Sequence, residues 1–142
     1  MSTGGLGFTL FELLVSVSII GILTAVVAFS FSSAQKKARD SRRVTDMNTI
    51  QKAAEQYYAS NNYNYPSSIN MPWNGNDGVA IMSNFPADPK GGSYVYSCNT
   101  MTASGYCCCA LMEVVAKGNS ANSSCGFTAA GSKDYFCVKN QQ

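Results

Sequence analysis

Residues 7–14 read Gly-Phe-Thr-Leu-Phe-Glu-Leu-Leu and open the stretch that decides the fold. From Leu13 to Gln35 the chain carries no charged residue, so Glu12 is a single acid at the mouth of a long apolar run. A bilayer-spanning helix takes about 20 apolar residues, which this run supplies. A carboxylate within such a helix is costly, about 2.5–3.5 kcal/mol at the centre, so Glu12 calls for a partner.

Three roles are open to the apolar run: a retained span, a cleaved secretory signal, or the core helix of a soluble domain. Its length exceeds the apolar core of a secretory signal, which is about 7–15 residues. Small residues stand at Ala28 and Ala34, but no small-x-small cleavage site is matched to a basic start. A retained single-pass span is therefore the prediction, with a cut near Ala34 as the alternative.

Composition limits the chemistry of the remaining chain. The 142 residues suit one domain, with about 105 of them left for a part outside the membrane. The chain has no His, which excludes His-dependent hydrolase triads and His-containing zinc sites. It also lacks a Gly-x-Ser-x-Gly motif and a phosphate-binding loop. We predict no enzymatic activity and no cofactor.

Six cysteines crowd the last third of the chain. They are Cys98, Cys107, Cys108, Cys109, Cys125 and Cys137. An even number of cysteines in a small exported domain is typical of disulfides formed in an oxidising compartment. Side chains alternate along a strand, so Cys107 and Cys109 share a face opposite Cys108, and each is expected to bond to a distant partner. A thiolate metal site is the rival, but no Cys-x-x-Cys pair supports it, and no metal ligand is predicted.

Helical periodicity continues beyond the apolar run, because apolar residues recur every three or four positions from Val44 to Tyr58. We expect one helix over residues 8–60, ended by polar residues that favour a turn. Strand candidates are Tyr94–Tyr96, Gly105–Val115 and Asp134–Val138, with a short helical turn at Val79–Asn84. The predicted fold is α+β: a long N-terminal helix, whose first half spans the membrane, packed on a small antiparallel sheet of three or four strands.

Two further motifs strengthen the interpretation of the N-terminus. Residues 57–66 read Tyr-Tyr-Ala-Ser-Asn-Asn-Tyr-Asn-Tyr-Pro, and residues 86–96 read Pro-Ala-Asp-Pro-Lys-Gly-Gly-Ser-Tyr-Val-Tyr. With the N-terminal motif and the apolar run, they resemble the type IV pilin family and, within it, the major pseudopilins of type II secretion. Prepilin leaders usually end in a basic stretch, whereas residues 1–7 contain no Lys or Arg.

The resemblance implies a processing site and an assembly site. A prepilin peptidase would cut between Gly7 and Phe8, and the new amine of Phe8 would be methylated. Glu12 would then pair with the Phe8 amine of a neighbouring subunit. Many pilins also close a C-terminal loop with a disulfide, for which we expect Cys125 to pair with Cys137.

On this resemblance the chain divides into a leader (1–7), a transmembrane and filament-core helix (8–34) and an extracytoplasmic globular domain (35–142). The implied function is that of a structural subunit of a type IV pilus-like filament or a type II secretion pseudopilus. Implied partners are other copies of the chain, other pilin-like subunits, the prepilin peptidase and the membrane, but no nucleic acid. The subunit would reside in the inner (cytoplasmic) membrane and then in an extracytoplasmic filament. The alternative is a membrane-anchored, disulfide-stapled extracellular binding module.

The charges are unevenly distributed. Residues 36–43 carry five positive charges and one negative charge, while the chain after them is nearly neutral. Three roles are open to this basic segment: contact with anionic headgroups, worth about 1 kcal/mol per residue, ion pairs between subunits, or a solvated helix face. A role in DNA binding would depend on charge alone, which is weak support.

Overall fold

The computed structural model describes residues 7–70 and 72–142, which form one helix and five strands. The chain separates into two compact units, Met1–Gln35 and Lys36–Gln142. Of the predicted leader, only Gly7 lies within the described residues. Helix α1 (Leu10–Ser60) contributes its first half to one unit and its second half to the other.

Helix α1 confirms the prediction of one uninterrupted helix, starting two residues later than expected. It begins at Leu10 because Thr9 occupies the capping position before the first turn. It ends after Ser60 because Asn62 and Tyr63 adopt positive φ angles of 54° and 59°. The amide of Tyr63 then donates to the carbonyl of Tyr58 at 3.1 Å, which satisfies an otherwise open carbonyl of the last turn.

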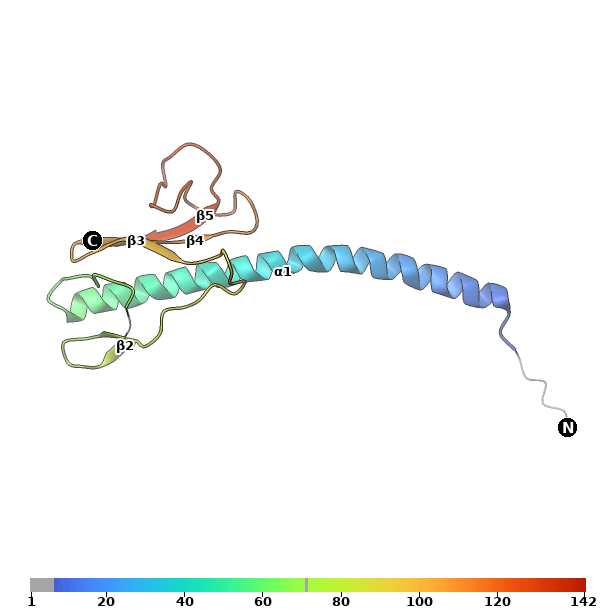
Figure 1. The fold of residues 1–142 in the computed structure, drawn as a ribbon, viewed down its shortest axis with the longest axis horizontal. Coiled ribbons are helices and arrows are strands. Elements are labelled where there is room, and N and C mark those ends of the chain that lie inside the picture. Colours follow the sequence, from blue (N-terminus) through green and yellow to red (C-terminus); the bar gives the residue numbers. More distant parts are fainter. Residues whose placement is uncertain (1–6, 71) are drawn as a thin grey trace. The chain divides into compact units, whose positions relative to one another are not determined.

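The second unit contains two antiparallel sheets (Figure 1). Strands β3 (Ser97–Thr102), β4 (Gly105–Leu111) and β5 (Tyr135–Lys139) form one sheet in that order, and β1 (Trp73–Asn74) pairs with β2 (Ala80–Met82). The prediction of a small antiparallel sheet of three or four strands is confirmed.

Two local predictions were wrong. Residues Tyr94–Tyr96 precede β3 and form no strand, since Gly91 and Gly92 turn the chain with φ angles of 67° and 64°. Val79–Asn84 contains strand β2 in place of a helical turn. There, Gly78, with φ of 78°, reverses the chain so that β2 pairs with β1.

The three-stranded sheet is covered on both faces. On one face, Tyr106, Cys108 and Ala110 belong to the same buried cluster as Met47 and Ile50 of α1. On the other face a second cluster lies under the connection between β4 and β5. It contains Cys107, Cys109, Cys125, Phe127, Tyr135 and Cys137. The predicted alternation of the three adjacent cysteines is therefore confirmed.

Candidate functional site

The predicted processing and assembly residues lie together at the start of α1. The amide and hydroxyl of Thr9 both donate to Oε2 of Glu12 at 2.9 Å, and the amide of Glu12 donates to Oγ1 of Thr9 at 3.2 Å. This reciprocal pair is a capping box, which satisfies free donors of the first helical turn. The Glu12 carboxylate is thereby held at the N-terminal end of the helix by Thr9, which directly follows Phe8, a residue that is 84% exposed. The roles of Gly7, Phe8 and Glu12 in processing and assembly stay predictions.

The helix in the unit Met1–Gln35 presents an apolar surface that none of the described residues of the unit covers. Its described large apolar side chains are exposed, from Leu10 at 82% to Phe31 at 62%. The hydroxyls of Ser16, Ser18 and Thr24 donate to backbone carbonyls of their own helix at 2.8–2.9 Å, so they need no water. Within the described residues, α1 is the one helix that is long and apolar enough to cross a membrane. Such a surface suits lipid or the helices of other subunits.

The unit Lys36–Gln142 buries a charge network where its part of α1 begins. Arg43 is fully buried and donates to both oxygens of Asp88 at 2.6 and 2.8 Å. Its remaining nitrogen, Nη1, donates to Asp40 at 2.6 Å and to Glu113 at 3.0 Å. Arg39 donates to both oxygens of Glu113 at 2.6 and 2.8 Å. The network therefore connects α1 with the loop before β3 and the segment after β4.

Two further groups complete the network. Lys90 lies 3.3 Å from Glu113, so Arg39, Arg43 and Lys90 balance three carboxylates. The ring of Tyr94 lies 4.8 Å from the Arg43 guanidinium and 4.1 Å from the Lys90 ammonium. Among the described residues, every buried side-chain nitrogen and oxygen has a hydrogen-bond partner, as a buried ion network requires.

The pKa shifts of Arg43, Asp88 and Glu113 favour the charged forms of these three side chains. Burial acts to lower the pKa of Arg43, but hydrogen bonds to three carboxylates outweigh it and raise the pKa above its usual range. Burial acts to raise the pKa of Asp88, but the hydrogen bond from Arg43 leaves it below the usual value. Hydrogen bonding from Arg39 is the main cause that lowers the pKa of Glu113 to about 2. The geometry is that of a structural clamp, because Arg43, Asp88 and Glu113 are held in their charged forms by hydrogen bonds to one another and to Arg39.

All six cysteines lie in pairs at disulfide distance. They join Cys98 to Cys108, Cys107 to Cys125, and Cys109 to Cys137. The expected pair of Cys125 with Cys137 was wrong. Cys137 lies directly opposite Cys109 in the β4–β5 ladder, so the sheet register selects that pair, and Cys125 in the covering loop reaches Cys107.

The three sulfurs of Cys107, Cys109 and Cys125 also lie within 4.8 Å of one another, as metal ligands would. They belong to two disulfides, and a disulfide sulfur is not the thiolate that binds zinc. This geometry therefore offers a ligand set only to a reduced protein.

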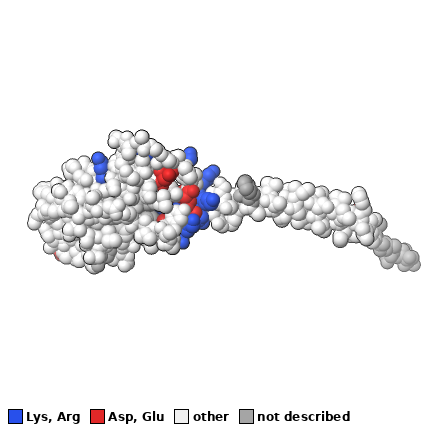
Figure 2. All heavy atoms as spheres, turned by 45° about the horizontal axis from the view of Figure 1, so that its top comes forward, with Lys and Arg blue, Asp and Glu red and all other residues white. Residues whose placement is uncertain are grey.

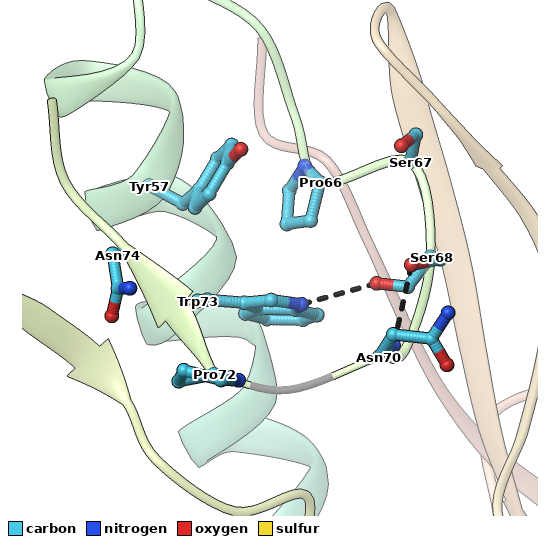
Figure 3. Close-up of a pocket in the computed structure, with 8 residues that line it drawn as sticks. All are labelled: Tyr57, Pro66, Ser67, Ser68, Asn70, Pro72, Trp73 and Asn74. Carbon is cyan, nitrogen blue, oxygen red and sulfur yellow. Dashed lines mark hydrogen bonds between the residues drawn. The ribbon is translucent and has the colours of Figure 1, made fainter.

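A pocket of about 270 Å³ lies beside the C-terminal end of α1 (Figure 3). It is bordered by Tyr57, Pro66, Pro72 and Trp73, and the indole N–H of Trp73 donates to the carbonyl of Ser68 at 3.0 Å. The described residues around this pocket include no acidic, basic or thiol side chain. It offers stacking surfaces and no group suited to acid–base chemistry.

Sequence reasoning missed the charge network and the capping box. The capping box has a local signal, Thr-x-x-Glu before an apolar run, which residues 9–12 display. Within the network only the Asp40–Arg43 spacing is local, because Arg43 meets Asp88 across 45 residues and Glu113 across 70. Two residues that seemed to belong to a basic surface segment, Arg39 and Arg43, instead serve as internal ion-pair partners.

Comparison with known proteins gives one informative relative. The chain is 30% identical over 100 residues to the type II secretion system core protein G of Aeromonas hydrophila. The aligned region covers 62% of this chain and 69% of the relative. No protein-family model matches the chain. No solved structure matches it either.

Proposed function

The chain belongs to the pseudopilin family of type II secretion core protein G, and from this membership we propose that it assembles through α1 after a prepilin peptidase cuts between Gly7 and Phe8. At the family level it is a subunit of a type II secretion pseudopilus, which assembles with other pilin-like subunits. Its apolar N-terminal helix is consistent with a membrane-anchored filament subunit.

The observation that carries the assembly proposal is the exposed apolar half of α1 with Glu12 in its first turn. In the membrane, lipid covers this surface. In a filament, the same surfaces of neighbouring subunits replace lipid, and close side-chain packing favours the exchange because apolar burial alone does not. The same surface of the subunit would thus contact lipid in the membrane and neighbouring subunits in the filament.

Glu12 would set the register of that packing. Cleavage after Gly7 converts the amide of Phe8 into a cationic amine, one residue before the capping position at Thr9. In a water-poor filament core, an amine and a carboxylate attract far more strongly than in water. An unpaired Glu12 would be costly there, so packings that bring an amine to it are favoured over slipped ones.

The globular unit fits a mechanical role outside the cytoplasm. Three cysteine pairs and a buried ion network hold its sheet, its covering loop and α1 together. We assign it no catalytic activity, and the work of the filament would be driven by a separate ATPase, as the family resemblance implies.

Two substitutions separate the two tasks of Glu12. Gln also forms a capping box, so Glu12→Gln keeps the helix cap and removes the charge, whereas Thr9→Ala removes the cap and keeps the charge. We expect Glu12→Gln to abolish recovery of the chain in sheared filaments while the membrane fraction stays at the wild-type level. Asp77→Asn, at an exposed acid of the globular unit, is the matched control. Wild-type filament yield from Glu12→Gln would overturn the ion-pair proposal.

A further inference from the structure

Internal pairing leaves a defined set of cations on the surface of the globular unit. Arg39, Arg43 and Lys90 are balanced within the buried network, and Arg42 lies 3.9 Å from Asp46. Five lysines are exposed, and no carboxylate pairs with them in the described part of the chain: Lys36, Lys37, Lys52, Lys117 and Lys139. Of these, Lys36 and Lys37 stand where the second unit begins, and Lys117 lines a hollow together with Lys37. Figure 2 shows most of the visible Lys and Arg side chains gathered in one band, with acidic side chains among them, and another basic side chain apart from that band.

Two of these lysines border a shallow hollow. Lys37 of α1 and Lys117 of the loop after β4 line it together with Asp40 and Val114, and its volume is about 260 Å³. Val115, beside it in the loop, is 70% exposed. An exposed aliphatic side chain two residues from a lysine, in a loop that lines a hollow with a second lysine, suits a surface that rests on lipid headgroups.

The loop that carries this side chain is firmly held. Both oxygens of Asp40 accept backbone amides, from Glu113 and Val114, at 2.9 Å. The amide of Ala116 donates to Asp134 at 2.9 Å. Val115 and Lys117 are therefore presented by a fixed backbone, and the ion network that fixes it also positions Lys37 on the same piece of α1.

Chain connectivity brings this surface to the membrane. Lys36 directly follows Gln35, the last residue of the uncharged run. If the run spans a bilayer, Lys36 and Lys37 emerge at its surface, whatever the orientation of the globular unit. Lys117 lines the same hollow as Lys37, and Val115 lies two residues before Lys117, so both can reach the same headgroup layer.

The placement of these cations also opposes their export. Lys and Arg after a span favour retention of that end in the cytoplasm, yet the six paired cysteines of the same unit indicate an oxidising compartment outside it. Arg39 and Arg43 are explained by the ion network, whereas Lys36, Lys37 and Lys117 have no partner in it.

We propose that Lys36, Lys37, Lys117 and Val115 form a basic collar that binds anionic phospholipid headgroups of the bilayer in which the subunit waits before assembly. The inference depends on the proposed function, because it requires a retained span. Bound headgroups hold the globular unit against the membrane, and entry into the filament releases them. Each lysine is expected to raise the equilibrium constant for docking of the collar on the membrane about fivefold. Salt near 1 M, where the screening length is about 3 Å, should weaken this docking.

A tryptophan probe in the full chain tests the collar. Val115→Trp and Leu23→Trp are placed separately in nanodiscs of phosphatidylcholine, with or without phosphatidylglycerol, and acrylamide quenching is measured against the wild-type signal of Trp73. We expect phosphatidylglycerol to protect position 115 and Lys117→Gln to reduce its docking constant about fivefold. Lys52→Gln, an exposed lysine away from the collar, should leave the protection unchanged.

The remaining outcomes each decide a different point. Equal quenching of position 115 in both lipids, whether high or low, overturns the collar, because anionic headgroups then contribute nothing. If position 23 is protected from acrylamide in both lipids, the membrane-span proposal stands even when the collar is overturned. Free access of acrylamide to position 23 would overturn the span itself, and with it both proposals.

Discussion

Helix α1 has two halves that differ in where their stabilising contacts lie. Before Lys36, the described side chains of the helix are exposed, including Ile22 at 66% and Val27 at 65%. After Lys36, Met47 and Ile50 have no exposed area, and Arg43 is buried among carboxylates. One continuous helix thus has a second half that is buried within its own unit. The described apolar surface of its first half suits lipid or other subunits.

This difference shows that helix formation and helix burial are separate matters. A long apolar segment can be helical wherever its backbone hydrogen bonds form, and its capping box and internally bonded hydroxyls support that state. The second half obtains its stability from tertiary packing, as most helices in globular proteins do. Substitutions in the two halves should therefore change different measurements.

The largest effect is expected at Arg43. Arg43→Ala leaves Asp88 and Glu113 buried without their main partner, which should reduce the free energy of unfolding by about 3–5 kcal/mol. Arg42→Ala, at the exposed neighbouring position, should change it by less than about 0.5 kcal/mol. Urea unfolding of the full chain in detergent, followed by the fluorescence of buried Trp73, measures both. A loss below about 1 kcal/mol for Arg43→Ala would show that the network is not a clamp.

The next effect concerns the covering loop. Replacing Cys109 and Cys137 with Ala opens a closed loop of 28 residues, which should cost about 3.6 kcal/mol of unfolding free energy by the chain-entropy argument. Replacing Cys98 and Cys108, which are 10 residues apart, should cost about 2.7 kcal/mol. The same unfolding experiment compares the two double variants. The reverse order would mean that loop closure does not govern their contributions.

A smaller effect is expected from acid. Because the folded state lowers the pKa of Glu113 from 4.5 to about 2, its contribution to stability is complete above the unfolded pKa and is lost as the pH falls through the folded one. The unfolding free energy should therefore decline between about pH 4.5 and pH 2. Glu113→Gln should flatten this decline, measured by urea unfolding across the pH series. An unchanged slope in the variant would assign the acid sensitivity to other groups.

The smallest effect on stability is expected at Glu12. Glu12→Gln keeps the capping box, whose hydrogen bonds lie within the first unit, so the unfolding free energy reported by Trp73 should stay within about 0.5 kcal/mol of the wild type. Its effect is expected in filament yield alone. A large shift of this free energy would show that the two halves of α1 are not independent.

Sequence reasoning was most successful where the signal is local. The hydrophobic period and the composition predicted the bounds of α1 to within two residues. They also predicted the alternation of Cys107, Cys108 and Cys109 and the short antiparallel sheet. The cysteine pairing failed because it depends on the register of β4 with β5, which brings Cys109 opposite Cys137. Glycine turns also overrode the strand propensity of the aromatic residues before β3.

The charge network illustrates the same limit at the candidate site. In sequence, Arg39 and Arg43 belong to a basic run, and nothing local distinguishes them from Lys36 and Lys37. Their burial follows from contacts with Asp88 and Glu113 that only the tertiary fold creates. The Asp-Pro motif at residues 88 and 89 lies in the loop that supplies Asp88 to the network. Its guanidinium partner, Arg43, is 45 residues away in the sequence.

The most direct test of the account is the N-terminus of the protein recovered from native membranes and from sheared surface material. Intact mass and the N-terminal peptide identify it. The account predicts a chain that begins at methylated Phe8, at least in the filament fraction. A chain that still begins at Met1 in both fractions would contradict it and would favour the membrane-anchored binding module.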